Sequence, residues 1–229
     1  MIGMNKRNQK NLLTALGLLV AFVLWTLAIR YLDVRPIGPD CSEVGFAGIN
    51  GWFHNLTGVH WGLYTLTDWL GLVPLCFVLG FALLGLVQIV TRKSLFKVDG
   101  DILVLGGFYV LVMAGYVLFE IFAINYRPVL INGILEASYP SSTTLLVLCV
   151  MPTAMMQFHS RIQNRLLRKS INFVIAAFTV FMVMGRLISG VHWLTDIIGG
   201  ILLSMALVML YYAICGCLRN GEVNSASGY

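Results

Sequence analysis

A histidine and an aspartate near the start of the last apolar segment are the residues best suited to do chemistry. His192 and Asp196 are four positions apart, and on a helix this spacing places two side chains on one face. The carboxylate can then accept a hydrogen bond from one imidazole nitrogen, which fixes the tautomer and leaves the other nitrogen free as a base or a nucleophile. A metal-binding pair is the alternative, but no nearby His, Cys or acidic residue supplies the further ligands that a metal needs.

Two arginines lie where membrane topology does not require them. Arg127 follows one apolar segment, and Arg186 lies near the end of another. An ionisable side chain at membrane depth is costly and usually marks a functional site, although an arginine can also extend toward lipid headgroups. Both arginines and His192 are predicted to lie at the same end of the helices. We therefore expect the three side chains to form an anion site.

A run of hydroxyl residues provides a third candidate part of that site. Ser141, Ser142 and Thr143 follow Pro140 directly before an apolar segment, a sequence that favours the start of a helix. The free backbone N–H groups at a helix N-terminus form a ready anion site. Alone, such a run is more often only a helix cap. Together with two arginines and a histidine–aspartate pair, it predicts a pocket for an anionic group.

The elements that position these side chains are predicted to be membrane helices. The 229-residue chain is 59% hydrophobic and 11% charged, with a mean hydropathy of +0.85, whereas ordinary soluble domains carry about 25% charged residues. About six apolar runs are each near the length that crosses the hydrocarbon core as a helix. They cover residues 11–32, 63–90, 102–125, 141–158, 171–188 and 193–217. We predict an all-α polytopic membrane protein, with residues 1–229 in one membrane-embedded domain.

The distribution of basic residues predicts the orientation. The net charge of +5 could suggest nucleic acid as a partner, but the lysines and arginines lie in short clusters between apolar runs, with few aromatic residues beside them. Most of them are in residues 6–10, 92–97 and 161–169, with Arg219 near the C-terminus. The positive-inside rule therefore places both termini in the cytoplasm and His192 on the outer side of the cell membrane.

The longest outer connector, residues 33–62, contains prolines, glycines and tryptophans. Turns and a short helix lying at the membrane interface are expected there, with the tryptophans at headgroup depth. His54 and His60 lie in this connector, either as interfacial polar residues or as groups close to the anion pocket.

The motifs resemble those of the type-2 phosphatidic acid phosphatase and haloperoxidase superfamily, in its membrane-bound branch. The spacing Arg–x5–His–x3–Asp at Arg186, His192 and Asp196 matches the third signature of that family. Arg127-Pro128 matches the end of the first signature, K-x6-R-P, and Pro140-Ser141 matches the start of the second, P-S-G-H.

This resemblance implies a membrane lipid phosphatase that uses no metal and no other cofactor. His192 would attack phosphorus and form a phosphohistidine, and Asp196 would orient the imidazole. The phosphoryl oxygens would be held by Arg127, Arg186, Ser141, Ser142 and Thr143, whose donors stabilise charge in the transition state; the arginines supply the positive charge that Mg²⁺ supplies elsewhere. The substrate would be a phospholipid or a polyprenyl phosphate or diphosphate from the bilayer, and the oligomeric state stays open.

Two departures from the signatures bear on the chemistry. Thr143 stands where the second signature has a histidine that protonates the leaving alcohol, a contribution typically worth about 10²- to 10⁴-fold in rate. Its absence favours diphosphate substrates, whose leaving phosphate is already a stable anion. Glu120 stands where the first signature has lysine, so it either weakens the site for a diphosphate or, if protonated in an apolar setting, donates the missing proton. His54 and His60 are further candidates for that acid.

Two alternatives to hydrolysis remain open at the level of sequence. A lipid phosphotransferase would pass the phosphoryl group to an alcohol in place of water. A degenerate member of the family would bind or transport a lipid phosphate without turnover, as the loss of the lysine and the acid histidine suggests.

Overall fold

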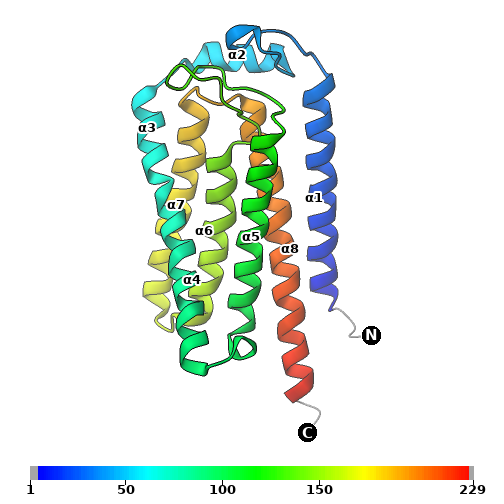
Figure 1. Ribbon diagram of the computed structural model, residues 1–229. Helices are drawn as coiled ribbons and strands as arrows, with labels where there is room; N and C mark the ends of the chain where they lie inside the picture. The colour runs from blue at the N-terminus through cyan, green and yellow to red at the C-terminus, as the bar shows by residue number, and fades with distance from the viewer. Residues whose placement is uncertain (1–4, 227–229) are drawn as a thin grey trace.

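The computed structural model describes residues 5–226, with side chains as far as Leu218, and its regular elements within this part are all helices (Figure 1). They are α1 (Lys6–Tyr31), η1 (Pro39–Cys41), α2 (Ala47–Thr57), α3 (Trp61–Leu70), α4 (Leu72–Arg92), η2 (Leu95–Lys97), α5 (Gly100–Ile121), α6 (Ser142–Arg161), α7 (Arg165–Ile188) and α8 (Leu194–Ala226). The predicted all-α membrane architecture is confirmed. Residues 1–4 and 227–229 of the predicted domain, and the Arg219 side chain, lie outside the described part.

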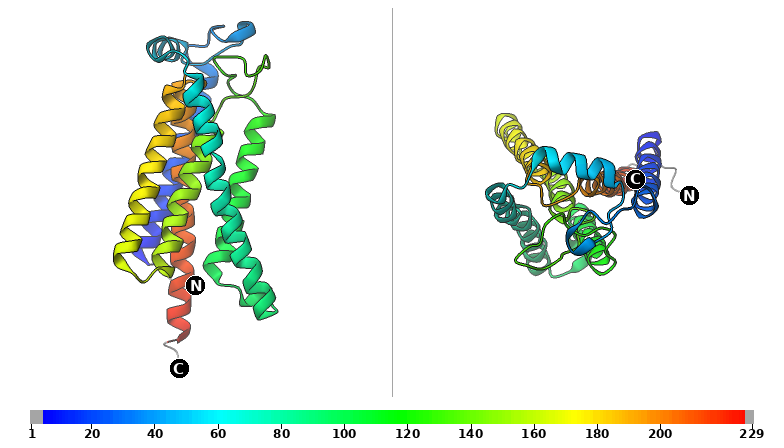
Figure 2. Two further views of the ribbon diagram at one scale, coloured as in Figure 1. Left: turned by 90° about the vertical axis from the view of Figure 1, so that its left-hand side faces the viewer. Right: turned by 90° about the horizontal axis from the view of Figure 1, so that it is seen from above.

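The long helices run side by side, and α2 lies across one end of the bundle (Figures 1 and 2). Helix α6 occupies the middle, where it packs against α4, α5, α7 and α8. Its side chains Val147, Cys149 and Val150 are fully buried. Helix α1 lies on the outside and packs along α8. The end covered by α2 is the end that the sequence predicts to be the outer one, since it includes the connector of residues 33–62.

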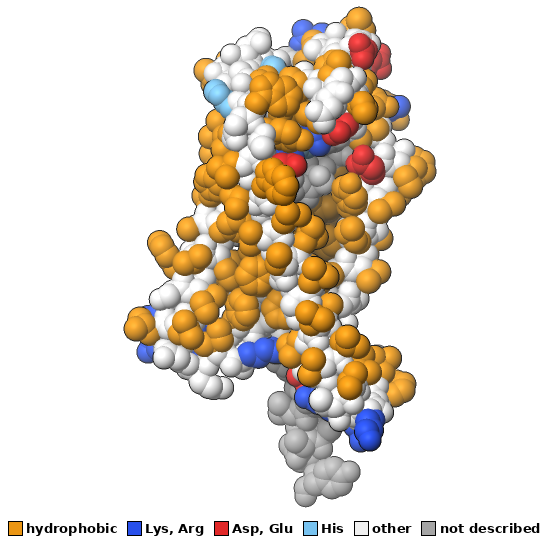
Figure 3. Space-filling view, turned by 60° about the vertical axis from the view of Figure 1, so that its left-hand side comes forward, with side chains coloured by type: hydrophobic (Ala, Val, Ile, Leu, Met, Phe, Trp, Pro, Cys, Tyr) orange, Lys and Arg blue, Asp and Glu red, His pale blue; other side chains and the backbone are white. Residues whose placement is uncertain are grey.

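Five described segments are long and apolar enough to cross a membrane: Lys6–Tyr31, Trp61–Arg92, Gly100–Ile121, Arg165–Ile188 and Leu194–Leu218. On the face shown in Figure 3, hydrophobic side chains cover the middle of the molecule between two ends that carry charged side chains. Helix α6 is not one of the five, because it combines apolar residues with the buried polar side chains of Thr153 and Gln157. A helix enclosed by other helices does not need a fully apolar surface. The sixth predicted span therefore stays a prediction.

Two predicted spans differ from the helices. The run 63–90 consists of two helices that meet at Gly71, whose N–H lies 3.0 Å from the carbonyl oxygens of both Thr67 and Asp68. The run 102–125 ends earlier, because α5 stops at Ile121 and the chain then enters an irregular loop. Hydropathy extends the run through Phe122–Ile124, but these residues no longer follow a helical path. The short helix expected in the first connector is α2.

Ion pairs join the helices at the end opposite α2. Arg161 from α6 pairs with Asp101 of α5 at 3.0 Å, and Arg92 from α4 pairs with Asp99 at 2.7 Å. The hydrogen bond from Arg92 holds the pKa of Asp99 below its ordinary value. The ends of α4, α5 and α6 that lie away from α2 are thus held together by polar contacts, while the site residues lie at the opposite end.

Candidate functional site

The imidazole of His192 lies between two arginines and a backbone carbonyl. His192 is in the short loop between α7 and α8 and is almost completely buried. Its Nε2 is 3.3 Å from Nη1 of Arg127 and 3.4 Å from Nη2 of Arg186. Its Nδ1 is 3.2 Å from the carbonyl oxygen of Ser138. The structure therefore brings together three of the predicted site residues, which are up to 65 positions apart in the chain.

These partners fix one tautomer of the imidazole. A carbonyl oxygen can only accept, so Nδ1 must carry the proton that it donates to Ser138. Guanidinium nitrogens can only donate, so Nε2 must present its lone pair to Arg127 and Arg186. Burial, and then the positive charges of the two arginines, hold the pKa of His192 well below its ordinary value. A neutral imidazole with its Nε2 lone pair directed at the arginines is the form suited to nucleophilic attack.

Asp196 does not make the predicted hydrogen bond to His192. Its nearest carboxylate oxygen is 3.8 Å from Nδ1 of the histidine, which is beyond hydrogen-bonding distance. The expectation rested on both residues lying in one helix, but His192 precedes α8, so the four-residue spacing does not align their side chains. Asp196 instead accepts the N–H of Trp193 at 2.9 Å, as an acidic residue in the first turn of a helix commonly does, and lies 3.4 Å from the Asn125 amide.

Arg127 is held by a glutamate that sequence reasoning missed. Its Nε is 3.0 Å from the Glu136 carboxylate, and its backbone N–H donates to the Glu136 carbonyl oxygen at 3.0 Å. Both residues lie in the loop between α5 and α6, which folds back on itself. The expectation that Glu120 faces the anion site is not supported: its side chain is exposed on α5 and forms no hydrogen bond or ion pair within the described part of the chain. The expectation came from the place of Glu120 in the first signature, where other members have lysine, but α5 ends at Ile121 and an irregular loop separates it from Arg127.

Arg186 is enclosed by residues of α3. Its Nη1 is 3.5 Å from the Asp68 carboxylate, and its guanidinium carbon lies 5.0 Å from the centre of the Tyr64 ring, in a cation–π contact. The arginine side chain is 2% exposed, whereas that of Asp68 is 59% exposed. Asp68 was also missed by sequence reasoning. An acidic residue within an apolar run is the same signal that identified Arg186, and it would have identified Asp68 as well.

The N-terminus of α6 lies against the start of α8. The backbone N–H of Ser141 donates to the carbonyl oxygen of Asp196 at 3.1 Å. The Ser141 side chain is fully buried and makes no capping bond to the first turn of α6, but accepts from Thr144 Oγ1 at 3.1 Å. The first-turn N–H groups, which have no partner within a helix, therefore stay available to an anion. Ser142 and Thr143 are partly exposed at this helix end.

A cavity of about 290 Å³ adjoins the site at the ends of α4, α5 and α6 that lie on the α2 side of the bundle. Most of its wall is apolar, with Leu72, Leu75 and Met113 among the lining residues. Its polar wall includes Asp68, Ser142 and Thr143. Asp68 thus links the cavity to Arg186, and the lining suits a hydrocarbon chain next to a polar group.

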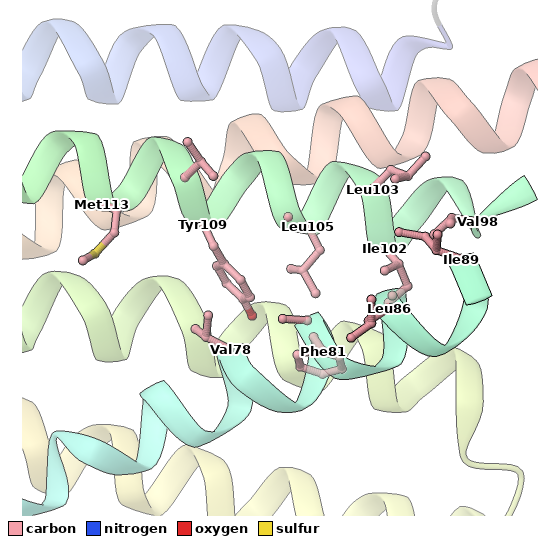
Figure 4. Close-up of a pocket in the computed structure, with 14 residues that line it drawn as sticks. Val78, Phe81, Leu86, Ile89, Val98, Ile102, Leu103, Leu105, Tyr109 and Met113 are labelled. Atoms are coloured by element: carbon pink, nitrogen blue, oxygen red, sulfur yellow. The ribbon is translucent and has the colours of Figure 1, made fainter. Parts of the chain in front are cut away.

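A larger apolar cavity, of about 610 Å³, lies between α4 and α5 (Figure 4). Its lining includes Val78, Phe81, Leu105 and Met113 and none of the predicted site residues. Such a lining can accommodate hydrocarbon but offers no group that would recognise a phosphate.

The two histidines of the first connector form no described hydrogen bond with the His192 imidazole. His54 is in α2, and its ring centre is 5.5 Å from that of Trp193. His60 points its Nε2 at the carbonyl oxygen of Thr57, 2.8 Å away, and is exposed. Neither contacts Arg127 or Arg186 in the structure. Among the described residues, no three His, Cys, Asp or Glu side chains are grouped so that they could hold a metal ion.

A comparison of the sequence with models of protein families identifies the family of this chain. The PAP2 superfamily matches residues 71–216, which is more than half of the chain. The chain belongs to the PAP2 superfamily. The matched region of this PAP2 chain contains Arg127, Arg186, His192 and Asp196, whereas Asp68 precedes it. The resemblance identified from the sequence motifs is thus confirmed.

One solved structure supports the fold of this PAP2 protein. It is the crystal structure of a transmembrane PAP2-type phosphatidylglycerolphosphate phosphatase from Bacillus subtilis, with a TM-score of 0.61 and 15% sequence identity. The match covers 87% of this chain and 94% of that one. No curated protein sequence matches this chain. Family and fold together support a membrane lipid phosphatase within an integral, multi-pass membrane protein.

Proposed function

We propose that this PAP2 protein hydrolyses a lipid phosphate at the outer leaflet through a phosphohistidine on His192. The observation that carries the proposal is the position of its Nε2, which faces Arg127 and Arg186 while Nδ1 is held by a backbone carbonyl. A phosphoryl group bound by the two arginines would meet the Nε2 lone pair directly. The positive-inside rule supports the placement of this site outside the membrane and of both termini in the cytoplasm.

Each neighbouring group has a role in this proposal. Arg127, Arg186 and the N–H groups at the start of α6 bind the phosphoryl oxygens and stabilise the charge that develops on them. Ser138 holds the tautomer through its carbonyl oxygen. Asp196 acts indirectly, because it caps the start of α8 directly after His192 and so fixes the loop that bears the histidine. The cavity beside Asp68 and Thr143 receives the part of the lipid next to the headgroup.

The reaction proceeds in two steps. Nε2 forms a bond to phosphorus as the bond from phosphorus to the lipid oxygen breaks, so the lipid alcohol leaves and a phosphohistidine forms. Water then attacks phosphorus and releases inorganic phosphate and the free imidazole. The arginines supply positive charge in both steps.

A phosphate-release assay with purified protein tests the proposal. We expect release from at least one of phosphatidic acid, phosphatidylglycerol phosphate and undecaprenyl diphosphate, and we expect His192→Ala to abolish it because the nucleophile is gone. His159→Ala is the matched control, since His159 is an exposed histidine near the inner end of α6, and it should retain full activity. Release of phosphate by His192→Ala at the wild-type rate would exclude the phosphohistidine.

The same assay separates the two other functions that the sequence leaves open. A phosphorylated alcohol among the products, identified by mass spectrometry, would indicate a phosphotransferase. Saturable binding of a lipid phosphate, without release and unchanged in His192→Ala, would indicate a binding or transport protein.

A further inference from the structure

The proposed hydrolysis does not yet identify the group that donates a proton to the departing lipid alcohol. Thr143 cannot supply it, because a threonine hydroxyl is a very weak acid. The donor must lie beside the phosphate site, on the side of the cavity that receives the lipid. It must also be accessible, because it has to exchange protons with water between turnovers.

Asp68 meets these conditions. Its carboxylate is 3.5 Å from Nη1 of Arg186, the arginine whose Nη2 is 3.4 Å from His192 Nε2. It also lines the 290 Å³ cavity together with Thr143. Asp68 lies near the C-terminal end of α3, and Gly71 directly follows that helix. A Cβ placed on Gly71 would be 3.8 Å from the Thr143 side chain, so this end of α3 lies beside the start of α6. Asp68 is thus shared by the phosphate site and the cavity that would hold the leaving alcohol.

Four other acidic or imidazole side chains at this end do not fit as well. Glu136 pairs with Arg127 and does not line the cavity. Glu120 is exposed on α5 and makes no described hydrogen bond or ion pair. His54 lies against Trp193, and His60 points at the carbonyl oxygen of Thr57. Of these groups, only Asp68 both contacts a site arginine and faces the cavity.

We infer that Asp68 is the general acid for the leaving lipid alcohol, in place of the signature histidine that Thr143 replaces. This inference rests on the proposed function. Phosphate binding between the arginines draws Arg186 toward the phosphoryl oxygens, so the Asp68 carboxyl is left facing the lipid oxygen in the cavity. As Nε2 bonds to phosphorus and the phosphorus–oxygen bond breaks, the carboxyl proton passes to the lipid oxygen. The resulting carboxylate then takes a proton from the water that attacks the phosphohistidine, and the carboxyl is restored.

The dependence of the rate on the leaving group tests this inference with the purified full chain. Asp68→Asn should slow phosphate release from phosphatidic acid, whose leaving group is an alkoxide, by about 10²- to 10⁴-fold. It should slow release from p-nitrophenyl phosphate, whose leaving group needs no proton, by less than about tenfold. Glu120→Gln, the matched control for loss of an acidic side chain, should leave both rates unchanged. Asp68→Asn combined with Thr143→His should recover activity on phosphatidic acid.

The outcomes separate this inference from the function on which it rests. If Asp68→Asn slows both substrates equally, Asp68 only positions Arg186, and the inference is wrong while the phosphatase assignment stands. If Asp68→Asn retains the wild-type rate on phosphatidic acid, the acid is another group. If the wild-type chain releases phosphate from no substrate, both the proposed function and the inference fall.

Discussion

At the scale of single residues, the site depends on the protonation state of one imidazole. The partners of His192 are two obligatory donors at Nε2 and one obligatory acceptor at Nδ1. Protonation of Nε2 would place a third positive charge against Arg127 and Arg186 in a buried space. The cost of that arrangement keeps the histidine neutral under conditions in which a solvated histidine would be charged.

The pH dependence of the reaction should reveal this effect. Activity is lost as the pH falls through the pKa of His192, and since burial and the two arginines lower that pKa, the loss should occur well below about pH 6.5. Arg127→Gln removes one positive charge, so the pKa should rise and the acid limb of kcat/KM should move to higher pH. Arg127→Lys keeps the charge and should move the limb less. Wild type and variants are compared on the same substrate, so the ionisation of the substrate affects all profiles equally. If the acid limb of Arg127→Gln lies at the same pH as that of the wild type, the prediction is wrong.

At the scale of elements, the loop that bears His192 is seated against the turn between α2 and α3. The backbone N–H of His60 donates to the Ser189 carbonyl oxygen at 2.9 Å. Gly190 has a φ of +71°, and a Cβ there would be 1.9 Å from the carbonyl oxygen of Gly58. A side chain at this position would therefore clash with backbone as well as strain the residue's own conformation, so glycine is needed for the loop to reach its place.

Gly190→Ala should accordingly displace His192. We expect phosphate release to fall by about 100-fold, since shifts of about 1 Å near reacting groups have effects of that size, and the melting temperature in detergent to fall as well. Gly133→Ala is the matched control: Gly133 has a φ of +79°, but a Cβ there would have no neighbouring atom within 4 Å, so only conformational strain of about 1–2 kcal/mol applies. Equal activity in the two variants would show that the close contact with Gly58 is unimportant.

The differences between sequence expectation and structure also belong to this scale. Hydropathy predicted where the long helices run, because burial in lipid demands continuous apolar helices. It did not predict the break at Gly71 that separates α3 from α4, since both helices are apolar. The motif spacing identified Arg127, Arg186 and His192, which the structure brings together. Spacing alone could not show that Asp196 caps α8, because that depends on where the helix begins.

Irregular backbone was the other limit to prediction. Glu136 and Ser138 reach Arg127 and His192 through a loop that folds back on itself, and no periodic pattern in the sequence encodes such a path. Asp68 is different, since a charged residue in an apolar run is a recognisable signal. Its pairing with Arg186 still required the packing of α3 against α7 to be known.

At the scale of the whole molecule, all the predicted chemistry lies at one end of the bundle and most of the basic clusters lie at the other. Helix α2 covers the site end, where Asn50 donates to Thr195 Oγ1 at 2.9 Å and accepts the backbone N–H of the same residue at 3.2 Å. The connector of residues 33–62 is thereby attached to the start of α8. In the proposed function, a lipid substrate reaches the site from the membrane plane, through the cavity between the ends of α4, α5 and α6.

Labelling of single cysteines from outside the cell tests the predicted orientation. Cys41 lies in the first connector and is exposed, so a chain that retains it as its only cysteine should react with a membrane-impermeant maleimide in intact cells. A chain without its native cysteines that carries Gln163→Cys, in the turn between α6 and α7, should react only after permeabilisation. The reverse pattern would place the site on the cytoplasmic side.

The Ser138 carbonyl oxygen, which accepts the hydrogen bond from His192 Nδ1, affects how this site would respond to mutation. It is a peptide oxygen, so every amino acid at position 138 supplies it, and substitutions there can disturb it only by moving the main chain. A systematic alanine scan would therefore pass over one of the closest neighbours of the nucleophile. Replacement of the Tyr139 amide by an ester, which weakens the preceding carbonyl as an acceptor, would reveal it.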